Sequence, residues 1–210
     1  MRMRRKPNLL SRIDNCAHLL VAEPKALCGH WLDEFKFEKL HIELGCGKGL
    51  FTVETAKLDP GILLVGLEKV SNVLIVALER VEQTDLQNVR FINRLADDLT
   101  AFFASKEVSR IYINFCDPWP ANRHKKRRLT GQRFLELYRY VLRPDGDVLF
   151  KTDDLQLFEF SIEKFEHCGF SLSDVTYNLH KNVPVGIMTD YEVKFHELGL
   201  PIYRCVARLN

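Results

Sequence analysis

The stretch from residue 40 to residue 68 constrains the fold most, because a strand, a glycine-rich loop, a helix and a second strand follow one another directly. The predicted segments are a strand over 40–44, a loop containing Gly45, Gly47 and Gly49, a helix over 50–58 and a strand over 62–67. Glycines let the backbone turn tightly beside a ligand, and the first amides of the helix offer donors to that ligand. The order is that of a βαβ ligand-binding unit.

The rest of the chain continues this alternation. Predicted helices cover 71–84, 98–104, 132–142 and 155–168, and predicted strands cover 89–92, 109–115, 147–151, 170–177 and 203–209, with a turn at 143–146. Strands that alternate with helices build a parallel sheet covered on both faces. We therefore expect an α/β fold with a doubly wound, seven-stranded, mostly parallel sheet and an antiparallel edge strand.

The composition fits one globular domain, with 210 residues of which 46% are hydrophobic. We expect a basic arm and a lead-in helix over 1–37 and the main domain over 38–210. No apolar run approaches the roughly 20 residues that span a membrane, and the basic N-terminus lacks the apolar centre of a secretory signal, so we expect a cytoplasmic protein. The six cysteines are scattered without metal-ligand spacing, which favours reduced thiols and no metal site.

Positive charge is concentrated in two short segments. Residues 1–12 and residues 123–128 each hold five Lys or Arg and no acid, which leaves 20 of the 30 basic residues against all 28 acidic ones. Two basic patches on an acidic body are typical of a protein that binds a polyanion such as RNA in one place. Two alternatives remain: the arm could be a solubilising tail or a degraded targeting segment, and residues 123–128 could be a solvated turn.

The loop that follows the strand over 109–115 combines an acid with an aromatic ring. In Asp117-Pro118-Trp119-Pro120, each proline removes an amide donor and favours extended backbone in the residue before it. We expect a stiff, non-helical loop that holds a carboxylate beside a tryptophan. Like the glycine loop, Glu68 and residues 152–154, it follows a strand, so all four should meet in one cleft.

Two acids near the glycine loop distinguish between possible cofactors. Glu68 lies 21 residues beyond Gly47, where an acid accepts the hydroxyls of a ribose. Glu43 precedes the first glycine and suits a cofactor with an amino group and a sulfonium, whereas it would repel a pyrophosphate. This pattern, with GxGxG spacing, favours S-adenosylmethionine over a dinucleotide. Alternatively, Glu43 is a strand-end acid that caps loop amides.

Several motifs together resemble the bacterial tRNA (guanine-N7)-methyltransferase family over roughly residues 38–207. They are Glu43-Leu-Gly-Cys-Gly-Lys-Gly49, Asp117-Pro-Trp-Pro120, the basic run 123–128 with Leu129-Thr130, Phe150-Lys-Thr-Asp-Asp154, and Thr189-Asp-Tyr-Glu192 followed by Phe195 and Pro201-Ile-Tyr. The resemblance implies a Rossmann-like class I methyltransferase fold, S-adenosylmethionine as methyl donor, and a guanine in the tRNA variable loop (position 46 in the family) as acceptor.

The resemblance also implies roles for individual residues. The cofactor would be bound by Glu43, Gly45, Gly47, Gly49, Glu68, Leu95, Ala96 and Asp117, with Asp117 at the methyl-transfer centre as the catalytic residue. The tRNA would be bound by Ala121, Arg123, His124, Lys125, Lys126, Arg127, Arg128, Asp153, Thr189, Asp190, Tyr191 and Glu192. No metal is implied. Without the resemblance, Thr189 and Glu192 match a helix capping box.

Two positions depart from the family pattern. Leu95 stands where the family usually has an acid that recognises adenine, so backbone groups near Leu95 and Ala96, or Asp97, would take that role. Ala121 stands where the family usually has a lysine, so Asn122 or Arg123 would replace that contact. Both departures concern affinity and leave the predicted class unchanged.

The acceptor chemistry agrees with these residues. Guanine N7 carries an in-plane lone pair and no proton, so methyl transfer needs alignment more than a strong base. We expect Asp117 to accept a guanine N–H and Trp119 to pack on a base. Two other functions remain open: methylation of another RNA or nucleotide position, and RNA binding without catalysis. Monomer and homodimer also remain open.

Overall fold

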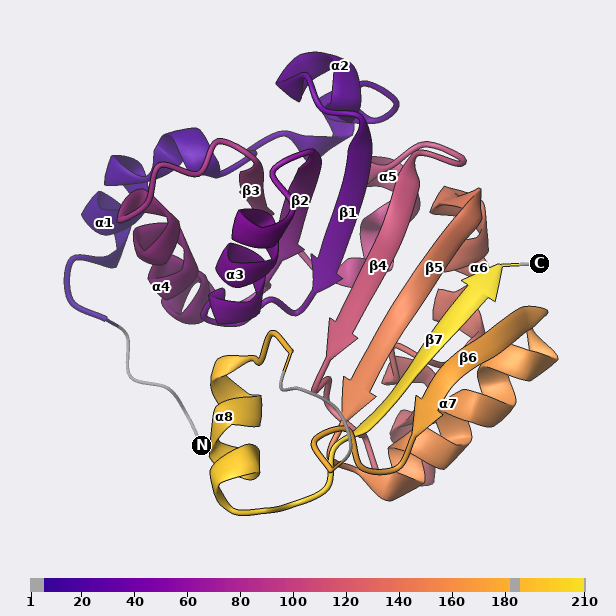
Figure 1. The fold of residues 1–210 in the computed structure, drawn as a ribbon. Helices are drawn as coiled ribbons and strands as arrows, with labels where there is room; N and C mark the ends of the chain where they lie inside the picture. The colour runs from indigo at the N-terminus through magenta and orange to yellow at the C-terminus, as the bar shows by residue number, and fades with distance from the viewer. Residues whose placement is uncertain (1–5, 182–185, 210) are drawn as a thin grey trace.

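Seven strands form a single mixed sheet in the computed structural model, which describes residues 6–181 and 186–209 (Figure 1). In sheet order the strands are β3 (Val89–Ile92), β2 (Ile62–Leu67), β1 (Lys39–Leu44), β4 (Val108–Asn114), β5 (Leu142–Thr152), β7 (Tyr203–Leu209) and β6 (Phe170–Thr176). The pairs from β3 to β5 are parallel, and β7 is antiparallel to both neighbours. The predicted fold is confirmed, with the antiparallel strand one place inside the edge strand β6.

Helices cover both faces of the sheet, as predicted. They are α1 (Leu9–Asn15), α2 (Trp31–Phe35), α3 (Leu50–Leu58), α4 (Ser71–Glu82), α5 (Leu99–Phe102), α6 (Gln132–Val141), α7 (Leu155–His167) and α8 (Asp190–Glu197). In Figure 1, α3 and α4 lie in front of the sheet, α5, α6 and α7 lie behind it, and α8 lies beyond the carboxyl ends of β1, β4 and β5. The helix α8 therefore stands at the end where ligands bind in such sheets.

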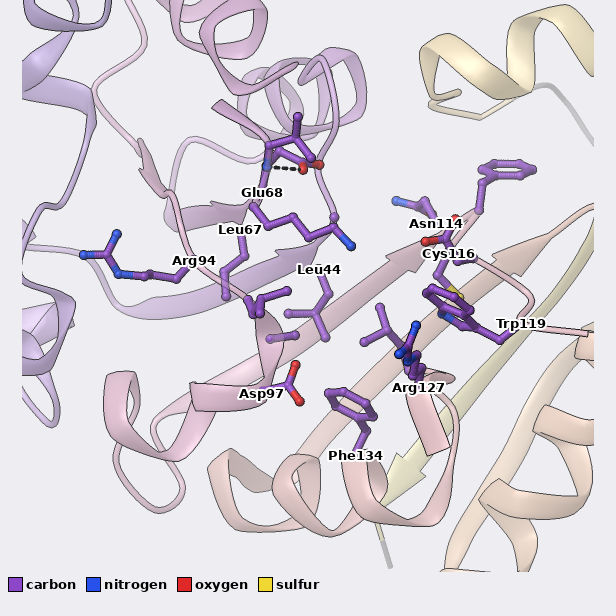
Figure 2. A pocket seen from close by; sticks show the side chains of 18 of the residues that line it. Leu44, Leu67, Glu68, Arg94, Asp97, Asn114, Cys116, Trp119, Arg127 and Phe134 are labelled. Atoms are coloured by element: carbon purple, nitrogen blue, oxygen red, sulfur yellow. Dashed lines mark hydrogen bonds between the residues drawn. The ribbon is translucent and has the colours of Figure 1, made fainter. Parts of the chain in front are cut away.

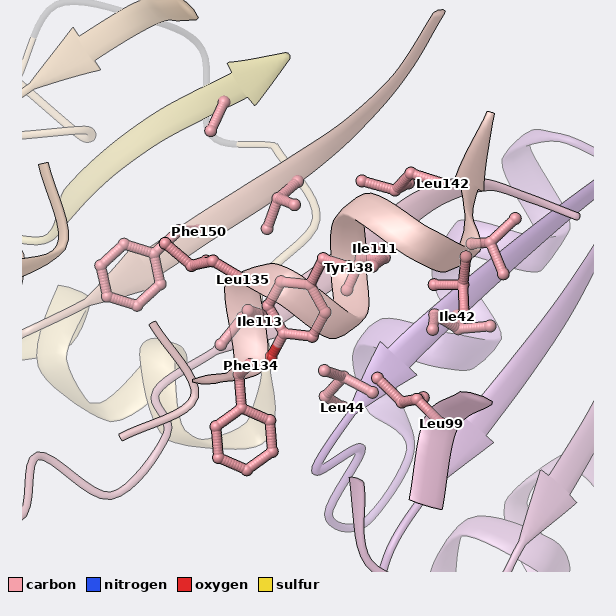
Figure 3. Packing of buried hydrophobic residues seen from close by; sticks show 14 of the residues in the cluster. Ile42, Leu44, Leu99, Ile111, Ile113, Phe134, Leu135, Tyr138, Leu142 and Phe150 are labelled. Atoms are coloured by element: carbon pink, nitrogen blue, oxygen red, sulfur yellow. The ribbon is translucent and has the colours of Figure 1, made fainter. Parts of the chain in front are cut away.

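Each face of the sheet has its own apolar core. All six residues of β2 are buried, because this strand is covered on both sides. On the α6 side, Phe134, Leu135 and Tyr138 pack against Ile111 and Ile113 of β4 (Figure 3). The helical spacing that predicted α6 thus places one apolar stripe on the sheet.

We predicted a turn at 143–146 that precedes a strand, and this prediction is wrong because the four residues belong to the strand itself. The strand β5 begins at Leu142, opposite Val108, and the register shifts before Asp147 pairs with Arg110, so the four residues bulge within the strand. Gly146 makes the bulge possible, because a Cβ there would lie 2.9 Å from the Leu142 Cδ2 atom and 3.0 Å from the Arg143 carbonyl oxygen.

Two predicted helices are shorter than expected. The lead-in helix is divided into a 3-10 helix, η2 (Pro24–Leu27), and α2, because Gly29 between them has a φ of 83°. The helix expected over 98–104 becomes a 3-10 turn, η3 (Ala96–Asp98), followed by α5. Phe103 leaves the helical conformation and its ring packs 5.3 Å from that of Trp31.

Residues 1–5, which hold three arginines of the predicted basic arm, lie outside the described residues. All six cysteines are free. Within residues 6–181 and 186–209, no group of three or more His, Cys, Asp or Glu side chains could hold a metal ion. No helix in the same ranges is long and apolar enough to cross a membrane.

His41 gives the fold a testable pH dependence. Its ring is 7% exposed and its Nδ1 lies 3.3 Å from the Tyr112 hydroxyl. Burial, with Arg110 nearby, lowers the pKa of His41 to about 4, so the unfolded chain binds the extra proton below about pH 6.5. We expect this residue to remove about 3 kcal/mol of stability between pH 6.5 and pH 4. Urea unfolding of wild type and His41→Leu over this range measures it, and parallel pH profiles would contradict it.

Candidate active site

A cavity of about 710 Å³ opens at the carboxyl ends of β1, β2 and β4. Its wall is built from the glycine loop, the residues after β2 and β3, and the loop after β4 (Figure 2). Among the residues predicted for the site, Gly45, Glu68, Leu95, Ala96, Asp97, Asp117, Trp119 and Arg127 line it. The volume lies in the range of small-molecule pockets, so the predicted cleft is present.

The three loop glycines have different surroundings, although all have a positive φ. A Cβ on Gly45, whose φ is 77°, would meet no atom within 4 Å, and Gly45 lines the cavity. A Cβ on Gly49, with the same φ, would lie 2.6 Å from the Ala77 Cβ of α4. Gly49 therefore allows α3 and α4 to pack closely, whereas Gly45 leaves room for a ligand.

We expect Gly49→Ala to lose more stability than Gly45→Ala. The two variants share the backbone strain of an alanine at φ 77°, about 1–2 kcal/mol, and only Gly49→Ala adds a steric clash of ~1–3 kcal/mol. Urea unfolding of both variants measures the difference. Equal losses would contradict this interpretation.

Glu68 stands at the end of β2 on one side of the cavity (Figure 2). Its Oε1 accepts a hydrogen bond from the Val70 amide at 2.8 Å, and its backbone oxygen accepts one from the Asn93 Nδ2 at 2.7 Å. These bonds fix the carboxylate at the rim. Elsewhere in the cavity lining, Asp97 pairs with Arg133 at 2.8 Å, and Leu95 is 50% exposed.

The loop after β4 is non-helical, as predicted, and Asp117 is exposed on it and lines the cavity. Extended backbone was predicted wrongly for Trp119, whose φ is 43°. Its neighbours hold it there, because the Arg128 Nε donates to the Pro118 oxygen at 2.9 Å and the Arg127 guanidinium lies 4.9 Å from the Trp119 ring centroid. In the same loop, burial raises the pKa of Cys116 to about 12, so its thiol stays protonated.

The basic run forms a 3-10 helix, η4 (Asn122–Arg127), in which Arg123, Lys125, Lys126 and Arg127 are exposed. Arg128 differs, since it is 6% exposed and its guanidinium lies 4.4 Å from the Phe160 ring centroid. The predicted phosphate contact of Arg128 therefore needs correction, because this side chain supports the loop from inside. The side chain of Asn122 lies outside the described part of the chain.

Glu43 is 1% exposed and does not line the cavity. Its carboxylate accepts hydrogen bonds from the Thr52 Oγ1 at 2.6 Å and from the Asn114 Nδ2 at 3.0 Å. Burial raises the pKa of Glu43, and these two bonds act against that rise. The carboxylate thus joins α3 to the end of β4. Its predicted direct contact with a cofactor stays a prediction, and in the structure the carboxylate reaches the cavity only through Asn114, which lines it.

The helix α8 is fastened by its polar residues. Thr189 and Glu192 form the capping box, with the Glu192 amide donating to the Thr189 Oγ1 at 3.0 Å. Asp190 accepts two hydrogen bonds of 2.9 Å from Arg80 of α4. Glu192 is fully buried and lies 2.6 Å from the Lys151 Nζ of β5. Of the four residues predicted to bind substrate here, only Tyr191 remains exposed.

Comparisons with known proteins place this chain in a family. A family described as "Putative methyltransferase" matches residues 38–205. Curated proteins named tRNA (guanine-N(7)-)-methyltransferase from Geobacillus thermodenitrificans (strain NG80-2) and Geobacillus kaustophilus (strain HTA426) are each 44% identical over 209 residues. These alignments cover 99% of this chain and 97% and 96% of those proteins. The chain belongs to the tRNA (guanine-N7)-methyltransferase family.

Solved structures agree with this family at the level of the fold. A structure of the 16S rRNA methyltransferase KamB matches with a TM-score of 0.68 at 14% identity, over 85% of this chain and 92% of that one. At this identity the likeness shows the fold alone.

In this tRNA (guanine-N7)-methyltransferase family member, the candidate cleft contains only some of the residues predicted to bind cofactor or substrate. Gly47, Gly49, Ala121, Asp153 and the residues of α8 are not in the cavity wall. Asp153 Oδ2 lies 3.4 Å from the Tyr191 hydroxyl, and the Tyr191 ring in turn contacts Phe115, which lines the cavity. Five of the eight predicted cofactor residues line the cavity, whereas Arg127 is the one predicted substrate residue in the lining that the structure describes.

Sequence reasoning missed several cavity residues, among them Phe115, Arg133 and Phe134. Phe115 directly follows β4, so the rule that ligands bind at strand ends could have included it. Arg133 and Phe134 lie in the first turn of α6, and their place in the wall depends on how that helix packs. No spacing in the sequence indicates it.

Proposed function

We propose that this protein transfers a methyl group from S-adenosylmethionine to N7 of a guanine in the variable loop of tRNA, at position 46. The observation that carries the proposal is the 44% identity to proteins of that name over nearly the whole chain. The cleft supports it, since Glu68 and the open side of Gly45 suit a nucleoside and Asp117 stands at the mouth.

S-adenosylmethionine, when bound, supplies an electrophilic methyl group on a sulfonium. The N7 lone pair forms the new N–C bond as the C–S bond breaks, and the bonding pair stays on sulfur, so the positive charge moves to the guanine ring. No proton has to leave N7. The protein therefore needs groups that align the two reactants and a negative charge near the ring.

We assign these tasks to residues of the cavity. Glu68 accepts the ribose hydroxyls, and backbone groups near Leu95 and Ala96 hold the adenine. Asp97 is already paired with Arg133, which favours the backbone groups for this role. Asp117 accepts a guanine N–H and stabilises the positive charge on the ring. Glu43 keeps the glycine loop and Asn114 in place.

The exposed cations of η4 are the proposed contacts to tRNA phosphates. We expect the double variant Lys125→Ala/Lys126→Ala to bind tRNA more weakly and to lower the slope of log Kd against log salt by about 1–2, because each lost phosphate contact removes roughly 0.7–0.9. Filter binding across a salt series measures this. Lys25→Ala, an exposed lysine of η2, is the control, and an unchanged slope in the double variant would contradict the role.

A modified transcript tests the acceptor atom. A tRNA with 7-deazaguanosine at position 46 has a C–H in place of N7 and keeps the Watson–Crick edge. We expect it to bind like the unmodified transcript and to accept no methyl group. Methylation of this transcript would show that the acceptor is an atom other than N7 of the guanine at position 46.

A further inference from the structure

Two aromatic residues with left-handed backbone stand on either side of Asp117. Phe115 has a φ of 52° and Trp119 has a φ of 43°, and both line the cavity. Bulky side chains rarely adopt this conformation, and it persists where the surroundings force it. For Phe115 the β-sheet is one such constraint, because its amide donates to the Lys151 oxygen of β5 at 2.9 Å. An aromatic residue with strained backbone thus stands two positions before and two positions after Asp117, and both line the cavity.

The Phe115 ring begins a row of aromatic contacts that leads to solvent, and it meets the Tyr191 ring at an angle of 49°. Its centroid lies 5.2 Å from that of Tyr191, which in turn lies 4.6 Å from that of Phe195 with an angle of 28° between the rings. Tyr191 is 45% exposed. These contacts therefore join the cavity wall to a partly exposed aromatic ring on α8.

The attachment of α8 to the rest of the domain does not require the exposed Tyr191 ring. The pairs Arg80–Asp190 and Lys151–Glu192 already fasten the helix to α4 and β5. An aromatic ring left half in solvent, beside a site for a polyanion, matches the way proteins hold unpaired bases, which stack on aromatic side chains.

We propose that Phe115, Tyr191 and Phe195 form an aromatic platform on which an unpaired base of the tRNA stacks beside the methylation site. The identity of the RNA rests on the proposed function. Contact by Tyr191 was already expected from the family. The proposal adds Phe115 and Phe195 to this contact and assigns base stacking as its kind. Thr189, Asp190 and Glu192 instead anchor the helix α8.

Removal of single rings tests the platform. We expect Tyr191→Leu and Phe115→Leu to raise both the KM and the Kd for a tRNA transcript about tenfold or more, with a smaller change in kcat. Tyr191→Phe keeps the ring and should stay within about twofold of wild type. Tyr140→Leu is the matched control, because Tyr140 is 49% exposed on α6. Its backbone oxygen accepts a hydrogen bond from the Lys106 amide, which precedes β4 at the opposite end of the sheet.

Three results would overturn the platform. The first is an unchanged tRNA Kd in Tyr191→Leu, and the second is an equal loss in Tyr191→Phe, which would give the role to the hydroxyl. The third is weaker binding of S-adenosylhomocysteine by Tyr191→Leu without RNA, which would make the ring a support of the cofactor site. Failure of the proposed function would look different, because wild type would bind tRNA without forming 7-methylguanosine, and the Kd series would still decide the platform.

Discussion

Asp117→Asn is expected to lower kcat at saturating tRNA by about 100-fold or more, with little change in the Kd for S-adenosylmethionine. Asparagine keeps the shape of the side chain and removes the charge. The reaction moves a positive charge onto the guanine ring, and fixed groups that stabilise charge arising in the transition state typically contribute ~10²–10³ in rate. Transfer of a labelled methyl group under saturating conditions measures the effect.

A second aspartate provides the control for this variant. Asp145 lies in the bulge of β5, its side chain is 83% exposed, and it does not line the cavity. Asp145→Asn should therefore turn over like wild type. If Asp117→Asn kept full kcat with saturating tRNA, Asp117 would have no part in stabilising the transition state.

Glu68→Ala is expected to raise the Kd for S-adenosylmethionine by about 10- to 100-fold. Hydrogen bonds to a charged group are worth ~1.5–3 kcal/mol, and both ribose hydroxyls would lose their acceptor. Isothermal titration with the cofactor alone measures the change, since no RNA is needed for this contact. The tRNA affinity should stay near that of wild type.

The control for Glu68→Ala is Glu82→Ala, which removes a partly exposed carboxylate at the end of α4 that pairs with His18. This variant should bind the cofactor as wild type does. An unchanged cofactor Kd in Glu68→Ala would show that the ribose is held elsewhere, and the assignment of this end of the cavity would be wrong.

Local patterns in the sequence predicted most of the framework. The run of apolar residues in β2 indicates a strand buried on both faces, and the structure buries all six of its residues. Thr189 and Glu192 predict a helix start that the structure contains as a capping box. Gly45, Glu68 and Asp117 could be placed in one cleft because each follows a strand of the same sheet.

Long-range contacts explain where the sequence was insufficient. Arg128 could not be distinguished from its four basic neighbours, because its burial depends on Phe160 of α7 and on the loop oxygens of residues 118 and 119. Pro120 favours extended backbone at Trp119, whereas the structure has left-handed backbone there. Contacts of this loop with Arg127 and Arg128 stabilise it. Such features follow from packing and have no local signal.

The same argument applies to Glu43. Its place before the glycine loop predicted a contact with the cofactor, whereas in the structure Thr52 and Asn114 use both of its oxygens. A buried carboxylate must find partners, and these lie on two other elements of the fold. The sequence identified an important acid, and only the structure shows what it binds.

The most direct test of the central claim is transfer of a labelled methyl group from S-adenosylmethionine to unmodified tRNA, followed by nucleoside analysis. We predict that the label is recovered as 7-methylguanosine and maps to the variable loop. Recovery of a different methylated nucleoside, or tight tRNA binding without any methyl transfer, would contradict the proposed function.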